Sequence, residues 1–138
     1  MTGKSVMEEE AIKVIREQFA FQTATQIRSC DTGRTKGCVY ACIVKEKYLY
    51  VGITENTLTQ RILEHLRHPK TRFTRMIGDL AEHEVLWAVL EHHPFTPGSS
   101  KRVYREDLGE AEKCWIKRWQ TFNTDHGLNE TAGGKGTQ

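Results

Sequence analysis

Two short runs of β-branched and aromatic residues, separated by three charged residues, constrain the fold of this chain most strongly. Residues 38–44 and 48–53 each have the composition of a β-strand, and residues 45–47 between them suit a tight turn. With a three-residue turn, Tyr40 lies directly across from Gly52. The sequence therefore predicts an antiparallel hairpin with a defined register.

Alternation along this hairpin separates a wholly apolar face from a face that carries tyrosines. We expect the apolar face to pack on the core, and its members are Val39, Ala41, Ile43, Leu49, Val51 and Ile53. A slip of one residue would mix the two faces, which favours this register. Tyr40 and Tyr50 fall on the other, non-core face, where Gly52 leaves space beside the Tyr40 ring. Tyrosines often only pack in strands, so the hairpin alone leaves packing and function both open.

Patterns along the rest of the chain predict an α+β protein. Helices are expected at residues 7–21, 57–67, 70–81 and 107–122, and a third strand at 85–90. Residues 22–37 are mostly polar and indicate a linker or a long loop. The order α-β-β-α-α-β-α predicts a small three-stranded antiparallel sheet flanked by helices, with an N-terminal helical extension. We divide the chain into an N-terminal helix and linker at 1–36 and a main domain at 37–138.

The N-terminal helix carries an apolar stripe of Ile12, Ile15 and Phe19, which packs on the core or forms a dimer contact. The 138 residues carry a net charge of +2, which permits a polyanionic partner without requiring one. We expect no membrane span and no signal peptide, and hence an intracellular location that is cytoplasmic in a prokaryotic or phage setting. The four cysteines have poor spacing for zinc and are expected to be free thiols.

One edge of the predicted helix at 57–67 carries Arg61 and His65, four residues apart and bordering the apolar face. A guanidinium there can hold a phosphate bidentately, and the imidazole can orient a water or donate to a phosphate oxygen. A solvated helix edge explains the same pattern. The stretch that follows is basic, as expected for a contact with a nucleic-acid backbone, through Arg67, Lys70, Arg72 and Arg75.

A carboxylate interrupts the apolar stripe of the last predicted helix. Glu112 shares this stripe with Leu108, Trp115, Ile116 and Trp119. A buried carboxylate is costly unless it is paired, hydrogen-bonded or bound to a metal. A structural ion pair or a position at the rim of the stripe would explain it, and so would a metal site. One carboxylate with several waters suits Mg²⁺.

Together these features resemble the GIY-YIG nuclease family. The resemblance runs from about residue 37 to residue 136. Its parts, in the family's order, are Cys38-Val39-Tyr40, Tyr50-Val51-Gly52, Arg61 with His65 on the next helix, Glu112 as the metal-binding glutamate, and Asn129 in a Gly-rich closing motif at 127–134. Cys38 replaces the family's first glycine, although Gly37 precedes it. The nine residues between the two tyrosines are at the short end for the family.

The resemblance implies a metal-dependent endonuclease that hydrolyses DNA phosphodiester bonds. Glu112 would bind one divalent metal, Mg²⁺ or Mn²⁺, and Arg61 would neutralise charge on the phosphoryl group. Tyr40 would be the general base, and Tyr50 would orient the water or the phosphate, with His65 assisting. Gly52 and Asn129 would support the site. DNA is the implied partner, and specificity would come from the domain itself, the N-terminal helix, a homodimer or a partner protein.

Two other classes compete with this interpretation. A non-catalytic DNA-binding module would use the same basic surface, bind without metal and show a steep salt dependence. A zinc-stabilised interaction protein would use cysteines with His92 and His93, although their spacing is poor for zinc. Restriction, mobile-element and repair roles all stay open.

Overall fold

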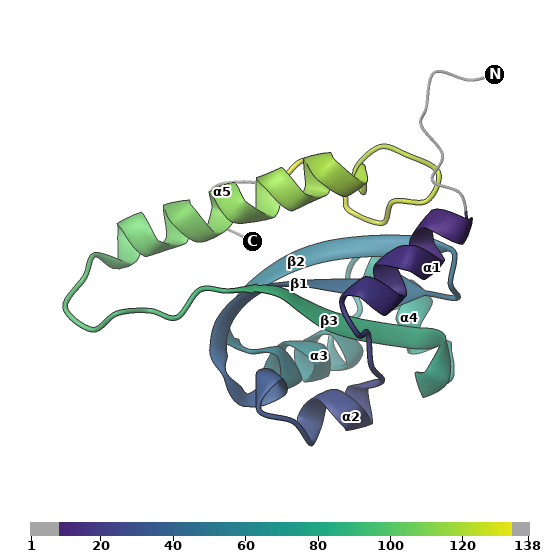
Figure 1. The fold of residues 1–138 in the computed structure, drawn as a ribbon, viewed down its shortest axis with the longest axis horizontal. Coiled ribbons are helices and arrows are strands. Elements are labelled where there is room, and N and C mark those ends of the chain that lie inside the picture. Colours follow the sequence, from purple (N-terminus) through teal and green to yellow (C-terminus); the bar gives the residue numbers. More distant parts are fainter. Residues whose placement is uncertain (1–8, 134–138) are drawn as a thin grey trace.

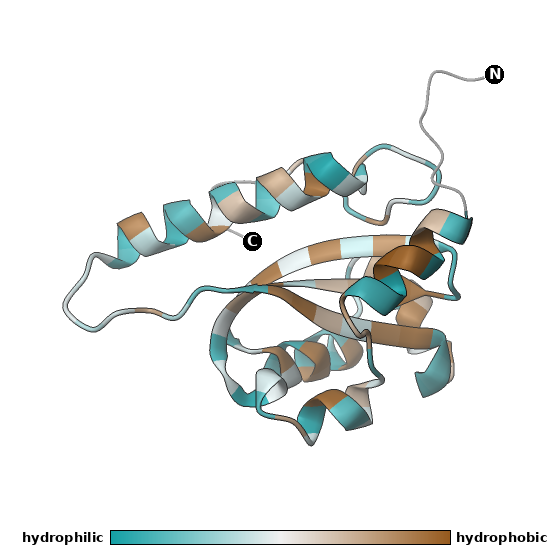
Figure 2. Ribbon diagram, viewed as in Figure 1, coloured by the Kyte–Doolittle hydropathy of each residue, from teal (hydrophilic) through white to brown (hydrophobic). Residues whose placement is uncertain are grey.

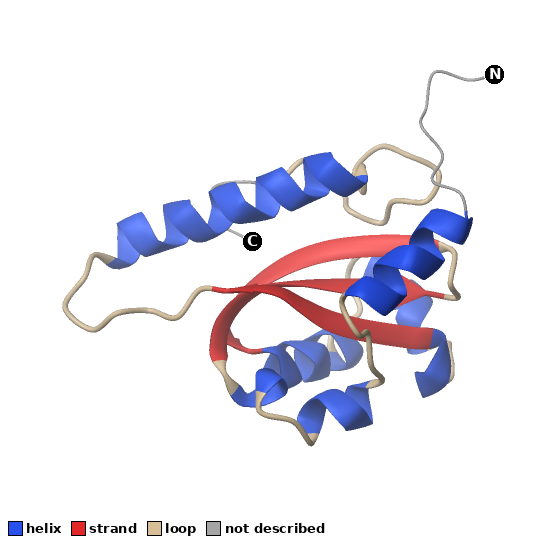
Figure 3. Cartoon of the chain, viewed as in Figure 1, coloured by secondary structure: helices blue, strands red, loops and turns tan. Residues whose placement is uncertain are grey.

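The computed structural model describes residues 9–133, and its elements form an α+β fold around one sheet (Figure 1). Residues 7 and 8 of the first predicted helix, and residues 134–136 of the region that resembles the nuclease family, lie outside the described part. The elements, distinguished by type in Figure 3, are α1 (Glu9–Gln18), α2 (Ala24–Arg28), η1 (Thr32–Arg34), β1 (Lys36–Val44), β2 (Tyr48–Thr57), α3 (Leu58–Arg67), α4 (Arg72–Gly78), η2 (Glu82–Glu84), β3 (Val85–His92) and α5 (Lys101–Trp119).

The sheet is three-stranded and antiparallel, in the order β2-β1-β3. Its hairpin has the predicted register, with Tyr40 across from Gly52 and Cys42 across from Tyr50. β1 is the central strand because β3 pairs with its other side. The α+β class, the three antiparallel strands and the register of the hairpin are therefore confirmed.

Helices α1 and α5 cover the face of the sheet that was predicted to pack on the core (Figure 1). Ile12 and Ile15 of α1 are buried there, and Phe19 makes edge-to-face contacts with Trp115 and Trp119 of α5. The apolar stripe of the N-terminal helix thus packs against this chain's own core. Figure 2 shows apolar residues along much of the strands and on α1.

The tyrosine-bearing face is also buried, so the expectation that it is a non-core face is wrong. A second apolar cluster covers it with residues from α2, α3 and α4, and Tyr40 lies in it with 0% of its surface exposed. Phe73 of α4 stacks on Tyr50 with ring centroids 3.9 Å apart. Tyrosine rings are amphipathic, so alternation along a hairpin does not reveal whether a helical layer will cover them.

The segment predicted as a linker contains the short helix α2. Thr23 caps it, since its side chain accepts from the Gln26 backbone N–H while the Gln26 side chain accepts from the Thr23 N–H. Ile27 of this helix is buried in the second cluster. A helix of five residues with a single buried apolar side chain has no periodicity to detect, which explains why a loop was expected.

Other predicted boundaries move as well: α1 ends at Gln18 rather than at residue 21, β1 begins at Lys36, β3 ends at His92 and α5 ends at Trp119. α5 begins at Lys101 rather than at residue 107, because Ser100 accepts a hydrogen bond from the Val103 N–H and caps the helix. α4 is shorter than the predicted helix at 70–81, with Thr71 as its N-cap. β2 continues past residue 53 to Thr57, which caps α3 in turn.

Segments outside the named strands pair with both outer strands of the sheet. Gln22 exchanges backbone hydrogen bonds of 2.9 and 2.7 Å with Trp87 of β3. On β2, Leu49 donates to the His126 carbonyl and accepts from the Leu128 N–H, both at 2.9 Å. The second pairing brings the segment after α5 alongside the strand that carries Tyr50. No helix among residues 9–133 is long and apolar enough to cross a membrane.

Candidate active site

A cleft of about 570 Å³ lies between β2, α3, α5 and the segment that follows α5. Tyr50, Arg61, Glu112 and Asn129, all predicted as site residues from the sequence, line it together. They come from four separate segments of the chain. Tyr40 and His65 do not line this cleft. Tyr40 contacts Arg61 and the His65 ring contacts the Tyr50 ring, so each touches a residue of the cleft wall.

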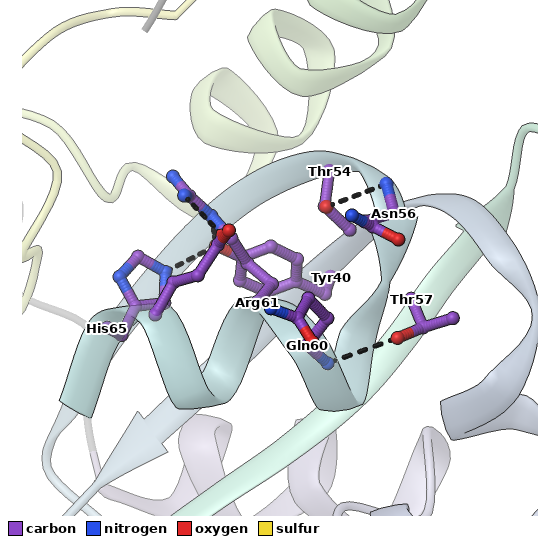
Figure 4. Close-up of polar contacts among 8 residues, drawn as sticks. Tyr40, Thr54, Asn56, Thr57, Gln60, Arg61 and His65 are labelled. Carbon is purple, nitrogen blue, oxygen red and sulfur yellow. Dashed lines mark hydrogen bonds and ion pairs between the residues drawn. The ribbon is translucent and has the colours of Figure 1, made fainter. Parts of the chain in front are cut away.

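Arg61 lies on α3 and points toward Tyr40 (Figure 4). Thr57 fixes the start of this helix by accepting from the Gln60 N–H at 3.1 Å. Arg61 Nε donates to Tyr40 Oη at 3.4 Å, and Nη1 donates to Glu64 Oε1 at 3.2 Å. Burial lowers the pKa of Arg61, but the interactions with Tyr40 and Glu64 raise it by more than burial lowers it. The net shift of the Arg61 pKa is therefore upward. The guanidinium is therefore a fixed positive charge at the cleft wall.

Tyr40 and His65 form a buried hydrogen-bonded pair, with 2.6 Å between Tyr40 Oη and His65 Nε2 (Figure 4). Burial, with a smaller effect of Arg61, lowers the pKa of His65 to about 3, so its imidazole is neutral at pH 7. Burial also raises the pKa of Tyr40 well above its ordinary value. Arg61 donates to the Tyr40 oxygen. We therefore assign the Tyr40 hydroxyl as the donor of the hydrogen bond to His65 and Nε2 of the neutral imidazole as its acceptor.

The two tyrosines differ in their access to the cleft. Tyr50 lines it, whereas Tyr40 lies fully buried behind Arg61 and His65. Burial raises the pKa of Tyr50 to about 12, and Arg61 opposes this shift because its charge favours the phenolate. Of the two hydroxyl groups, only that of Tyr50 belongs to a residue with direct access to a molecule in the cleft.

Gly52 is required by the position of the Tyr40 ring. A Cβ at this position would lie 2.5 Å from Tyr40 Oη and 2.6 Å from Tyr40 Cζ. The space that a side chain at position 52 would fill is thus taken up by the hydroxyl end of the Tyr40 ring. Gly52 allows the hydroxyl of Tyr40 to reach Arg61 and His65.

Glu112 is 8% exposed and lies on the buried stripe of α5, beside Leu108 and Ile116. The backbone passes close to it at Gly133, where a Cβ would lie 3.2 Å from Glu112 Oε1. Gly133 has φ +81°, so a residue with a side chain would be strained there as well. A carboxylate at the wall of a polar cleft is a hard oxygen donor of the type that Mg²⁺ prefers.

Among residues 9–133, no three His, Cys, Asp or Glu side chains gather into a group that could hold a metal. A divalent cation at Glu112 would therefore take its other ligands from water and from the substrate's oxygens. The cysteines in this part of the chain are free thiols, and burial raises the pKa of Cys38 to about 12.

Asn129 fixes the edge of β2 next to Tyr50. Its Oδ1 accepts from the Val51 N–H at 2.9 Å, and its Nδ2 donates to the Val51 carbonyl at 2.7 Å. The side-chain amide thus pairs with the strand as a backbone residue would. This contact joins the segment after α5 to the strand that carries Tyr50, and the supporting role expected for Asn129 stays a prediction.

The predicted DNA contacts lie outside the cleft. All four side chains are exposed, namely those of Arg67, Lys70, Arg72 and Arg75. Thr71 does line the cleft, so this basic stretch meets the cleft at one point on its rim. The Arg72 N–H donates to Glu130 Oε2 at 2.9 Å, which joins the stretch to the segment after α5.

Sequence reasoning missed six charged residues of the cleft wall: Lys36, Glu55, Glu64, Lys101, Arg105 and Glu130. Two of them follow from the true start of the last helix, which its apolar pattern does not reveal. Lys101, Arg105 and Leu108 precede Glu112 at the spacing of one helical stripe, once the helix is known to begin at residue 101. The predicted helix began at residue 107, which left Lys101 and Arg105 in a loop.

Comparisons with protein-family models, with curated proteins and with solved structures found no match to this chain.

Proposed function

We propose that this chain is a divalent-metal-dependent DNA endonuclease with a GIY-YIG-like site in the cleft between β2, α3 and α5. The observation that carries the proposal is the convergence of Tyr50, Arg61 and Glu112 on one cleft. These three residues come from three different elements, β2, α3 and α5, and each is predicted from a sequence motif. Core packing accounts for a buried tyrosine or glutamate singly, but it does not require all three side chains to meet at a polar opening.

Glu112 would hold the metal through its carboxylate oxygens, at the point where the apolar stripe of α5 meets the cleft. When bound, Mg²⁺ or Mn²⁺ supplies Lewis-acid polarisation of the scissile phosphate and stabilises the leaving oxygen. Glu112 lies between Leu108 and Ile116 on the buried stripe of α5, which restricts the positions that its carboxylate can take.

Arg61 would bind the scissile phosphate and neutralise charge that develops on it. Tyr40 holds Arg61 from the core side through Nε, which leaves Nη2 for a phosphate. Glu64 contacts Nη1 and has a partly exposed side chain, so a phosphate can replace it at modest cost. His65 in turn holds the Tyr40 hydroxyl.

Access to the cleft favours Tyr50 as the group that takes the proton from the attacking water. The water oxygen forms a bond to phosphorus, the bond from phosphorus to the leaving oxygen breaks, and the water proton passes to the Tyr50 phenolate. Burial raises the pKa of Tyr50 to about 12 and Arg61 opposes that rise, so formation of the phenolate would depend on the positive charge beside it. Tyr40 then acts as a positioning residue for Arg61, which reverses the roles that the family resemblance implied for the two tyrosines.

Nicking of supercoiled plasmid tests the metal role. With Mg²⁺ or Mn²⁺ present, we expect the wild type to nick and Glu112→Gln to lose activity by roughly 10²-fold or more. Glu110→Gln is the matched control, because Glu110 is exposed on the same helix. Equal activity of the wild type and Glu112→Gln would contradict the proposal that Glu112 binds the metal.

Three tyrosine variants separate the two roles. We expect Tyr50→Phe to lower kcat by roughly 10²- to 10⁴-fold, the range for loss of a general base. Tyr40→Phe should mainly weaken phosphate binding through Arg61 and raise KM. Tyr48→Phe is the control, since Tyr48 is on the same strand as Tyr50 but does not line the cleft. If Tyr40→Phe loses kcat and Tyr50→Phe does not, the base is Tyr40.

DNA binding without cleavage is the second candidate, and the exposed basic residues on α3 and α4 favour it. This function predicts metal-independent binding with a steep salt dependence and no nicking by the wild type. Binding in EDTA together with the plasmid assay distinguishes the two functions in one set of samples.

A further inference from the structure

The cleft has two ends that differ in charge. Asn129 pairs with Val51 near one end, and Glu55 lies four residues further along β2, roughly 13 Å away. Glu112, Glu130 and Glu64 are the carboxylates of the wall besides Glu55. Three cations, Lys36, Lys101 and Arg105, belong to the Glu55 end, where that single carboxylate opposes them.

Contacts of Glu55 place two of these cations. Arg105 donates to Glu55 through Nε at 2.7 Å and through Nη2 at 3.4 Å. Lys101 Nζ lies 3.9 Å from the same carboxylate. Lys36 begins β1 opposite Thr57, two residues beyond Glu55 on β2. One carboxylate cannot neutralise three cations, so this end of the cleft keeps a net positive charge.

The ion pairs of this cluster are exposed and therefore easily exchanged. The side chains of Lys101, Arg105 and Glu55 are 62%, 50% and 37% exposed. Exposed pairs of this kind contribute about 0–1 kcal/mol each. A phosphate that enters the cleft can replace Glu55 as the partner of Arg105 at little cost.

The stripe of α5 aligns these cations with the proposed metal site. Lys101, Arg105 and Glu112 all line the cleft from one helix, whose first turns extend past the end of the sheet (Figure 1). At 1.5 Å per residue, Arg105 lies roughly 10 Å and Lys101 roughly 16 Å along the helix from Glu112. A DNA strand advances about 3.4 Å per nucleotide, so these distances correspond to roughly three and roughly five nucleotides.

We propose that Lys101 and Arg105, with Lys36, form a second phosphate-binding surface that holds the cleaved DNA strand to one side of the scissile bond. This inference depends on the proposed function for its ligand. The strand lies along α5, with the scissile phosphate between Arg61 and Glu112 and its flank at the Glu55 end. The surface recognises backbone phosphates and is a different surface from the basic stretch on α3 and α4.

The salt dependence of DNA binding tests this surface. Binding of a fluorescein-labelled duplex to the full chain is measured in EDTA, to stop metal-dependent cleavage, over roughly 50 to 200 mM salt. We expect the slope of log Kd against log salt to fall by about one for Arg105→Ala and by about two for Lys101→Ala with Arg105→Ala. Arg105→Lys keeps the charge and should keep most of the slope.

Arg102→Ala is the matched control, because Arg102 is exposed on the same turn of α5 but does not line the cleft. A thermal melt of each variant verifies folding. If Arg105→Ala and Arg102→Ala give the same slope of log Kd against log salt, the proposed phosphate-binding surface is wrong. It is also wrong if the wild type binds no DNA. If the wild type cleaves but the slopes do not change, the surface fails and the nuclease stands. If the slopes change but no metal supports cleavage, the surface stands and the nuclease fails.

Ethylation of single phosphates gives a positional test on the cleaved substrate. We expect interference at the scissile phosphate and at roughly three and five nucleotides to one side of it. The interference at these two flanking positions should disappear in Lys101→Ala with Arg105→Ala and persist in Arg102→Ala. Interference restricted to the scissile phosphate would overturn the placement of the strand along α5.

Discussion

At the scale of single residues, the contact between Gly52 and Tyr40 connects the sheet to the site. The hydroxyl of Tyr40 reaches Arg61 and His65 only because position 52 has no side chain. One missing methyl group on β2 thus determines where a guanidinium on α3 points. Both partners of that contact belong to the buried half of the site, where small changes in volume have large effects.

Gly52→Ala should destabilise the fold by about 1–3 kcal/mol, the usual effect of overpacking a core. It should also lower nicking activity, because the Tyr40 hydroxyl must move away from Arg61. Urea unfolding measures the first effect and the plasmid assay the second. Gly78→Ala is the control, since a Cβ there meets no atom within 4 Å. Equal stability of the two variants would contradict the close contact.

His65 should make stability depend on pH below its ordinary range. The pKa of His65 in the folded chain is about 3, below the 6.5 of the unfolded chain. Its contribution to stability is therefore complete above pH 6.5 and is lost as pH falls toward 3, at about 1.4 kcal/mol per pH unit.

The free energy of unfolding, measured in urea between pH 6.5 and 5, isolates this effect from most carboxylates. We expect the wild type to lose stability over this interval and His65→Gln, although less stable at pH 7, to lose much less. His68→Gln, at an exposed position one residue beyond α3, should behave as the wild type does. A His65→Gln variant with the full wild-type slope would contradict a neutral, buried His65.

At the scale of elements, β2 is the strand on which the site is built. It carries Tyr50 and Gly52, pairs with β1 on one side and receives the Asn129 amide on the other. The position of the Tyr50 hydroxyl in the cleft thus depends on a segment more than seventy residues further along the chain. Asn129 can therefore support the candidate site through this contact with β2.

Asn129→Ala should cost about 1–3 kcal/mol of stability, because it leaves the N–H and carbonyl of Val51 without this partner. Hydrogen exchange at the Val51 amide should become faster, and unfolding in urea should occur at lower denaturant. Asn56→Ala is the control, because Asn56 also lines the cleft but is exposed. Unchanged exchange at Val51 would contradict the role assigned to Asn129.

At the scale of the whole molecule, two apolar clusters enclose one sheet. The sequence could predict the first cluster, because Val39, Ala41 and Ile43 alternate strictly and the stripes of two helices match them. It could not predict the second. Phe73 and Ile27 cover the tyrosine face from helices of seven and five residues, which are too short to show a periodic pattern.

The candidate site divides in the same way. Tyr40, Tyr50, Arg61 and Glu112 could be selected from local motifs, since each lies at a definite position on a predicted strand or helix. Lys101 and Arg105 could not, because the first turns of α5 are polar on most sides and an N-cap rather than an apolar stripe fixes their start. The burial of Tyr40 also escaped prediction, since it depends on contacts between distant segments.

The pairing of Gln22 with β3 and of Leu128 and Asn129 with β2 has a consequence for how copies of this chain meet. An outer strand with free N–H and C=O groups is a template on which another chain can add a strand, and a three-stranded sheet has two such edges. Here each edge already carries a segment of the same molecule. A second copy that approaches edge-on at Trp87 of β3, or at Leu49 or Val51 of β2, would first have to displace that segment.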